Sequence, residues 1–142
     1  MNEQMKLEAY NAIRAKAEAN PLYQKSKSIH KKFQYLRFFD DANRPLNGQQ
    51  IRREDANSIP EGADGFDEKS ARIVIYNFVD GLLQSENDEP AVQYPNHWEF
   101  WNQGLLQKVV ADGGDSEEYW ENGLPVRIET NLAQRRRNGE EI

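Results

Sequence analysis

The two histidines are the first residues of the chain whose chemistry could form a site. His97 lies two residues before Glu99, and His30 lies far from both in the sequence. A helical zinc site needs histidines four residues apart with a glutamate beside the first, and no such pair occurs. We expect His97 and Glu99 on a helix, where residues two apart point away from each other, so Glu99 is interpreted as the capping-box partner of Asn96. An enzyme with an unrecognised site around His97 and Glu99 is kept as the second alternative function.

The other carboxylates and glycines predict no metal or nucleotide site. The run from Asp112 to Glu118 lacks the alternating ligands and the terminal bidentate glutamate of a calcium loop. The sequence contains no phosphate-binding glycine loop, no Gly-x-Ser-x-Gly turn and no cysteine. We therefore predict no catalytic residue, no metal and no cofactor.

Basic residues in the first quarter of the chain form the second candidate site. Within an expected helix over residues 22–40, lysines lie near Tyr35 and Phe38, whose rings could stack on exposed bases. A nucleic-acid-binding protein that uses this lysine face is the first alternative function, although a net charge of −6 repels a phosphate backbone. The residues of this alternative are Lys25, Lys27, Lys31, Lys32, Arg135, Arg136 and Arg137.

Charge is divided unevenly along the chain. Residues 1–38 contain eight basic and three acidic side chains, a net charge of +5, whereas the remainder contains ten basic and 21 acidic side chains, a net charge of −11. This asymmetry favours a charged partner surface, or a homodimer in which the two segments meet across a two-fold axis. The acidic remainder suits a basic groove that normally holds a phosphate backbone.

These observations favour a non-catalytic protein-binding module. We expect a small acidic inhibitor or adaptor that acts on nucleic-acid machinery, of the kind that mobile elements such as phages and plasmids encode. Exposed aromatic side chains beside carboxylates are typical anchors for a protein partner. The predicted protein-binding residues are Asp80, Glu86, Asp88, Glu89, Phe100, Asp112, Asp115, Glu117, Glu118, Tyr119, Trp120 and Glu121.

The chain carries no sign of a membrane or secreted protein. No apolar run approaches the roughly 18 residues of a membrane span, and the N-terminus has no signal-peptide core. The lack of cysteine fits a reducing compartment. We expect a soluble, cytoplasmic protein without a membrane partner.

Apolar periodicity predicts the elements that hold these residues. A length of 142 residues suits one domain, and 11% aromatic residues offset a hydrophobic content of 37%. Residues 3–19, 22–40, 67–83 and 96–113 carry apolar side chains at spacings of three and four, which predicts helices. A short turn over 115–123 and a last helix ending at residue 137 follow. The predicted fold class is mainly α, with four to five helices in a single domain over residues 1–142.

Other segments show different patterns. Residues 124–129 alternate between apolar and polar side chains, which predicts a small β element. Residues 41–66 are predicted to form a long irregular loop, 85–93 an acidic connector and 138–142 a frayed tail, and we find no internal repeat. The predicted core consists of Ile29, Phe33, Leu36, Ile75, Phe78, Leu82, Trp101 and Leu105.

Overall fold

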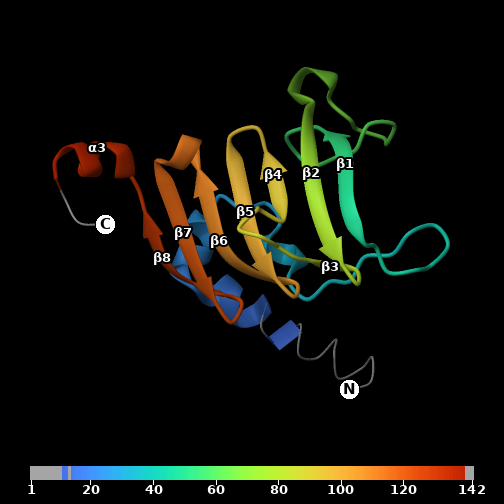
Figure 1. Ribbon diagram of the computed structural model, residues 1–142, viewed down its shortest axis with the longest axis horizontal. Coiled ribbons are helices and arrows are strands. Elements are labelled where there is room, and N and C mark those ends of the chain that lie inside the picture. The colour runs from blue at the N-terminus through green and yellow to red at the C-terminus, as the bar shows by residue number, and fades with distance from the viewer. Residues whose placement is uncertain (1–10, 13, 140–142) are drawn as a thin grey trace.

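An antiparallel β-sheet of eight strands organises the chain (Figure 1). The computed structural model describes residues 11–12 and 14–139. Seven strands follow the order β1-β2-β4-β5-β6-β7-β8, and the short β3 pairs with β2. The prediction of a mainly α fold is therefore wrong. The strands are β1 (Gly48–Glu54), β2 (Arg72–Val79), β3 (Leu82–Leu83), β4 (Val92–Tyr94), β5 (His97–Asn102), β6 (Leu105–Ala111), β7 (Ser116–Glu121) and β8 (Leu124–Glu129).

Helices in the described residues are short. They are helical residues 14–19, α2 (Pro21–Lys25) and α3 (Leu132–Arg137), with 3-10 turns at Lys31–Phe33, Glu68–Ser70 and Asp112–Gly114. The last helix is confirmed as α3, whereas the helix over 22–40 is wrong, because α2 ends at Lys25 and residues 26–30 are not helical. The helix predicted over 3–19 is helical where described, and residues 3–10 and 13 lie outside the described part, as does 140–142 of the predicted frayed tail. No helix of the described chain is long and apolar enough to cross a membrane.

Strand β2 explains why two long segments were predicted as helices. Val74 and Phe78 are buried on one face of the sheet, whereas Ile73 and Val79 are 50% and 41% exposed on the other. Both faces of the strand thus carry apolar side chains. Taken together, these side chains recur at spacings of three and four residues, as they do along the apolar face of an amphipathic helix. The β-branched run around Ile75 favours the strand. Segment 96–113 behaves in the same way and forms β5 and β6.

Three hairpin turns share one backbone geometry and one sequence pattern. The turns at 80–81, 103–104 and 122–123 each place two successive residues at positive φ, between 50° and 84°. This is the arrangement of a type I′ turn, which matches the twist of the strands that it joins. An aromatic residue precedes each glycine by three positions and a leucine follows it. The chain therefore contains a repeated hairpin motif that the sequence prediction did not find.

The core lies on one face of the sheet, which we call the covered face. The segment 14–46 packs there, and in Figure 1 its blue and teal trace passes behind the strands. Of the predicted core residues, Phe78 and Trp101 are buried, whereas Ile29 and Leu36 are 38% and 37% exposed. Phe33, Ile75, Leu82 and Leu105 are half-buried. The predicted irregular loop 41–66 is wrong in its middle, because it contains β1.

Polar side chains attach residues 26–30, here called the strap, to the covered face. The Ser26 hydroxyl donates to Glu118 at 2.6 Å, and the Ser28 hydroxyl donates to Glu99 at 2.7 Å. His30 Nε2 lies 2.9 Å from the hydroxyl of Tyr94. These three contacts reach three different strands, β7, β5 and β4. The strap therefore has one register on the sheet.

Candidate functional site

The face of the sheet opposite the strap, here called the open face, carries a line of apolar residues. The strand register places Ile51 beside Ile75, Ile75 beside Gln93, Gln93 beside Trp98 and Trp98 beside Val110. Ile51 is 62% exposed and Trp98 is 43% exposed. We call Ile51, Ile75, Trp98 and Val110 the apolar row.

Two of the four members of the apolar row, Ile51 and Trp98, are exposed, and Ile75 and Val110 are half-buried. The solvated face of an antiparallel sheet is usually polar, because the alternation of side chains separates the two faces. Here Ile73 adds to the row with half of its surface exposed, and Phe100 lies half-buried on the same face. Gln93 interrupts the row between Ile75 and Trp98, yet several exposed apolar side chains on one sheet face are typical of a surface that binds another molecule. The open face is therefore the candidate functional site.

A hollow of about 120 Å³ lies beside the row, where the β4–β5 and β6–β7 turns approach each other. We call it the Trp98 hollow. Its lining is mainly apolar, and its one titratable residue is His97, whose ring contacts Glu99 on the covered face. The lining residues are Pro95, Asn96, His97, Trp98, Val110, Gly113 and Gly114.

The structure brings His97 and Glu99 together. Their Nε2 and Oε2 atoms are 2.9 Å apart, because residues two apart on a strand share a face. The prediction that they point away from each other is wrong, and Glu99 caps no helix. The distance is that of an ion pair, although the ring N–H is not aligned well enough on the carboxylate for a hydrogen bond.

Glu99 is fully buried and accepts hydrogen bonds on both oxygens. Ser28 donates to Oε2, and the indole nitrogen of Trp101 donates to Oε1 at 3.0 Å. Burial raises the pKa of Glu99, but His30, His97 and the Ser28 hydroxyl outweigh burial and hold that pKa below its usual value. Glu99 is therefore a charged anchor of the covered face.

The acidic connector stands over the open face on the other side of the row. Asn77 donates to the carbonyl of Pro90 at 3.1 Å, and Gln84 donates to Asn102 at 3.2 Å. This acidic loop, residues 84–90, borders a second hollow of about 120 Å³ that is lined in part by Val79. The predicted binding residues Glu86, Asp88 and Glu89 are all exposed there, whereas residues 92–93 of the predicted connector belong to β4.

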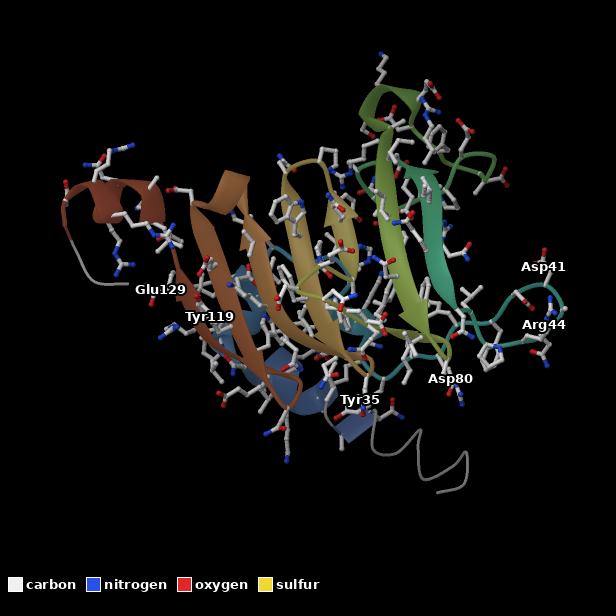
Figure 2. All side chains as sticks on the ribbon, in the orientation of Figure 1. Tyr35, Asp41, Arg44, Asp80, Tyr119 and Glu129 are labelled. Carbon is white, nitrogen blue, oxygen red and sulfur yellow. The ribbon has the colours of Figure 1, made fainter. Side chains whose placement is uncertain are left out.

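Two other predicted binding residues lie on the open face of β7, where charged side chains surround them. Glu117 pairs along the register with Val110, and Tyr119 pairs with Lys108. The guanidinium of Arg127 lies 4.3 Å from the centre of the Tyr119 ring, and the Tyr119 hydroxyl donates to Glu117. Burial and this hydrogen bond raise the pKa of Tyr119. Figure 2 shows Tyr119 and Glu129 together at the β7–β8 side of the sheet, far from Asp80.

The remaining predicted binding residues do not belong to one surface. Glu118 and Trp120 are buried on the covered face, so the prediction that they contact a partner is inconsistent with the fold. Asp80 pairs with Arg37 and Asp112 pairs with Lys27, each in a turn. Asp115 accepts a hydrogen bond from the backbone of Ala133 at the start of α3, and Glu121 is exposed at the end of β7.

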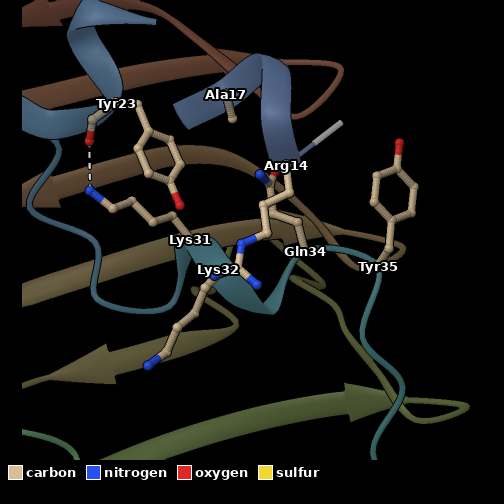
Figure 3. A pocket seen from close by; sticks show the side chains of 7 residues that line it. All are labelled: Arg14, Ala17, Tyr23, Lys31, Lys32, Gln34 and Tyr35. Atoms are coloured by element: carbon tan, nitrogen blue, oxygen red, sulfur yellow. Dashed lines mark hydrogen bonds between the residues drawn. The ribbon is translucent and has the colours of Figure 1, made fainter. Parts of the chain in front are cut away.

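The lysines of the nucleic-acid alternative do not form one helical face. Lys31 donates to the carbonyl of Tyr23 at 2.6 Å and lies over that ring, and burial lowers the pKa of Lys31. Figure 3 shows Arg14, Lys31 and Lys32 around a pocket of about 10 Å³, which has room for no more than a water molecule. Lys25 ends α2, and Arg135, Arg136 and Arg137 lie on α3. Nucleic-acid binding by these residues stays a prediction.

The apolar row is the part of the site that the sequence prediction missed. Ile51 was placed in an irregular loop, and Ile75 was placed in the core. The signal was the presence of apolar residues at consecutive positions of β2, which puts them on both faces. Among the residues that the structure describes, no three histidine or carboxylate side chains are grouped to hold a metal ion.

Comparisons with protein-family models, with curated proteins and with solved structures find no match to this chain.

Proposed function

We propose that this chain is a non-catalytic protein-binding module, and that its open face binds an apolar protein segment bordered by lysine or arginine. The observation that carries the proposal is the apolar row, whose members Ile51 and Trp98 are 62% and 43% exposed on the open face. Burial of an exposed tryptophan and its apolar neighbours against a partner removes a large apolar area from water. The row is also rigid, because its members are held by five paired strands.

Charge supports a basic partner. Glu86, Asp88 and Glu89 are exposed beside the open face, and none of them has an ion pair within the described chain. Carboxylates at the rim of an apolar surface favour a partner of opposite charge and disfavour a second copy of a chain whose net charge is −6. A basic groove that normally holds nucleic acid has this chemistry, so an inhibitor or adaptor of nucleic-acid machinery is the form of the function that we propose.

The lining of the Trp98 hollow supports binding over catalysis. His97 is its one titratable side chain, and a general base needs a second reactive group within reach. Its nearest charged neighbour, Glu99, is buried and engaged by Ser28 and Trp101. The pair of His97 and Glu99 therefore belongs to the packing of the covered face and gives the open face no catalytic group.

Site-specific photo-crosslinking tests this proposal. A benzoylphenylalanine at Trp98 is expected to crosslink to a single protein in the native host, whereas the same group at Val126 is not. Val126 is 49% exposed and lies on β8, with β6 and β7 between it and β5, so it is a matched control. A crosslink only between copies of this chain, or equal crosslinking from both positions, contradicts the proposal.

The purified partner then allows a quantitative measurement. We expect Ile51→Asp combined with Trp98→Asp to weaken binding by at least about a hundredfold, as the loss of a buried anchor does. Val126→Asp should leave the affinity within about twofold. Because all three positions are exposed, the variants should fold, and an unchanged affinity for the double variant would show that another surface binds.

A further inference from the structure

Strand β1 ends the sheet and leaves backbone groups unpaired along its outer edge. It pairs with β2 on one side, and on the other side the carbonyl of Arg53 accepts from the N–H of Glu61 at 2.9 Å. Because alternate residues of a strand direct their backbone groups to the same side, those of Gln49 and Ile51 also point outward. Among the described residues, no hydrogen bond reaches the outward N–H and C=O of Gln49 and Ile51.

The features that usually protect an edge strand are present on β8 and missing from β1. Pro125 of β8 has no N–H, and its carbonyl accepts from the side chain of Asn20 at 3.1 Å. Strand β1 is seven residues long, contains no proline and pairs with β2 without a bulge. Its two arginines lie beside carboxylates of the chain itself. The outer edge of β1 can therefore accept a further strand.

Side chains and charge around this edge define what would pair with it. Ile51 is 62% exposed at the end of the apolar row, so an apolar side chain opposite it would extend the row. Asp41 and Asp64 are exposed in the loops before and after β1, and Figure 2 shows Asp41 in a loop that projects beyond the strands. Residues 40–68 contain eight acidic and three basic side chains, a net charge of −5, which favours a basic segment.

We infer that the outer edge of β1 binds an extended segment of the protein partner as an added strand. The segment places an aliphatic side chain opposite Ile51 and carries lysine or arginine at its ends. This inference deepens the proposed function and rests on it. The added strand is antiparallel, as every strand pair of the sheet is, and its backbone pairs with the N–H and C=O groups of Gln49 and Ile51.

Hydrogen exchange of the full chain, with a peptide as the probe, tests this inference. The probe is the capped peptide Lys-Thr-Val-Thr-Val-Thr-Lys, whose β-branched residues favour a strand and whose valines share one face. In the free chain the amides of Gln49 and Ile51 should exchange at least about a hundredfold faster than those of Gln50 and Arg52, which face β2. Saturating peptide should slow exchange at Gln49 and Ile51 at least about tenfold. Unchanged exchange at these two amides overturns the inference.

Methylated peptides separate backbone pairing from side-chain contact. A residue directly opposite Ile51 lies on the same face and points its own N–H at β1, so the valine N–H groups face the edge. N-methylation of both valines should weaken binding at least about tenfold, whereas N-methylation of two threonines should change it less than about threefold. Equal effects of the two modifications contradict strand addition.

A substitution in β1 provides the complementary test. Gln49→Pro removes one outward N–H, which an edge strand tolerates, and Gln49→Ala keeps that N–H while removing the same side chain. The proline variant should bind the peptide at least about fivefold more weakly than the alanine variant. Equal affinities would show that the N–H of residue 49 makes no contact with the peptide.

The peptide titration also distinguishes this inference from the proposed function. If the peptide leaves exchange at Gln49 and Ile51 unchanged while Trp98 still crosslinks to a partner, the inference fails and the function stands. If the peptide protects both amides but no partner crosslinks at Trp98, the edge of β1 binds a strand and the proposed function fails. Both results come from chains with an intact β1.

Discussion

Glu99 is the residue at which three polar side chains of the covered face converge. It accepts hydrogen bonds from Ser28 and Trp101 and lies beside His97. Glu99→Ala would leave these buried groups without their partner. We expect the free energy of unfolding to fall by about 3–5 kcal/mol, the range for breaking a buried charged network. Urea denaturation measures this, with the exposed Glu121→Ala as a control that should change it by less than about 0.5 kcal/mol.

His30 predicts how stability depends on pH. Burial lowers its pKa below 6.5, although the carboxylates of Glu99 and Glu54 oppose that shift. The native chain therefore binds a proton on His30 less readily than the unfolded chain does. Stability should be unaffected by His30 above pH 6.5 and should fall as the pH drops below it, by up to about 1.4 kcal/mol per pH unit until the native pKa is reached.

Urea denaturation above pH 6.5 and at pH 4.5 checks this expectation. Carboxylates whose native pKa is lowered, Glu68, Glu99 and Glu129, add a slope of the same sign that grows as the pH approaches 4.5, so the comparison with a His30 variant assigns the remainder. The variant His30→Gln should show a flatter pH dependence there. If the slope of the variant equals that of the wild type, another group is responsible.

The β2–β3 turn shows at the scale of one element how glycine controls the hairpins. Gly81 has a φ of +81°, and a Cβ atom there would lie 2.8 Å from the carbonyl oxygen of Phe38. Gly48 has a φ of +88° but nothing within 4 Å, so it is a matched control. Gly48→Ala should cost about 1–2 kcal/mol of unfolding free energy through backbone strain alone.

Gly81→Ala should cost about 1–3 kcal/mol more than Gly48→Ala, because the segment around Phe38 must also move. Thermal or urea denaturation of the two variants measures the difference. Equal losses of unfolding free energy would mean that residues 37–38 move at no energetic cost and that only backbone strain matters at this turn.

Strand register is the element-scale feature that creates the candidate site. The members of the apolar row come from four strands, and β4 lies between two of them. A shift of β5 by one residue would turn Trp98 toward the covered face and Glu99 toward solvent. The buried contacts of Glu99 prevent this, so the covered face holds the open face in register.

At the scale of the whole molecule, the acidic loop beside the apolar row predicts that the affinity for the partner depends on salt concentration. Glu86, Asp88 and Glu89 border the row, and their attraction for a basic partner is screened by salt. We expect a triple variant, in which all three residues are replaced by the corresponding amides, to bind the partner about tenfold more weakly at low salt. The binding of this variant should also lose most of its dependence on salt. Isothermal titration at two salt concentrations measures both effects.

The Asp64→Asn variant serves as the control for that experiment, because Asp64 is exposed in the loop between β1 and β2 and does not line the acidic-loop hollow. It should retain the wild-type salt dependence. A salt response that persists in the triple variant would place the electrostatic contact elsewhere on the molecule.

The sequence by itself determined the local features of this protein. The alternation over 124–129 is confirmed as β8 and the end of the chain as α3, since both depend on neighbouring residues. The exposed acids of loop 84–90 were also recognised, because charged residues among turn formers stay in water.

Only the tertiary structure decided the fold class and the site. In β2 and β5 apolar residues face both sides of the sheet, and their spacing does not distinguish such a strand from a helix until its neighbours are known. The proximity of His97 and Glu99, the contact of Ser28 with Glu99 across 71 positions, and the alignment of Ile51 with Trp98 all follow from strand pairing. Pairing is a non-local property, so no window along the chain contains it.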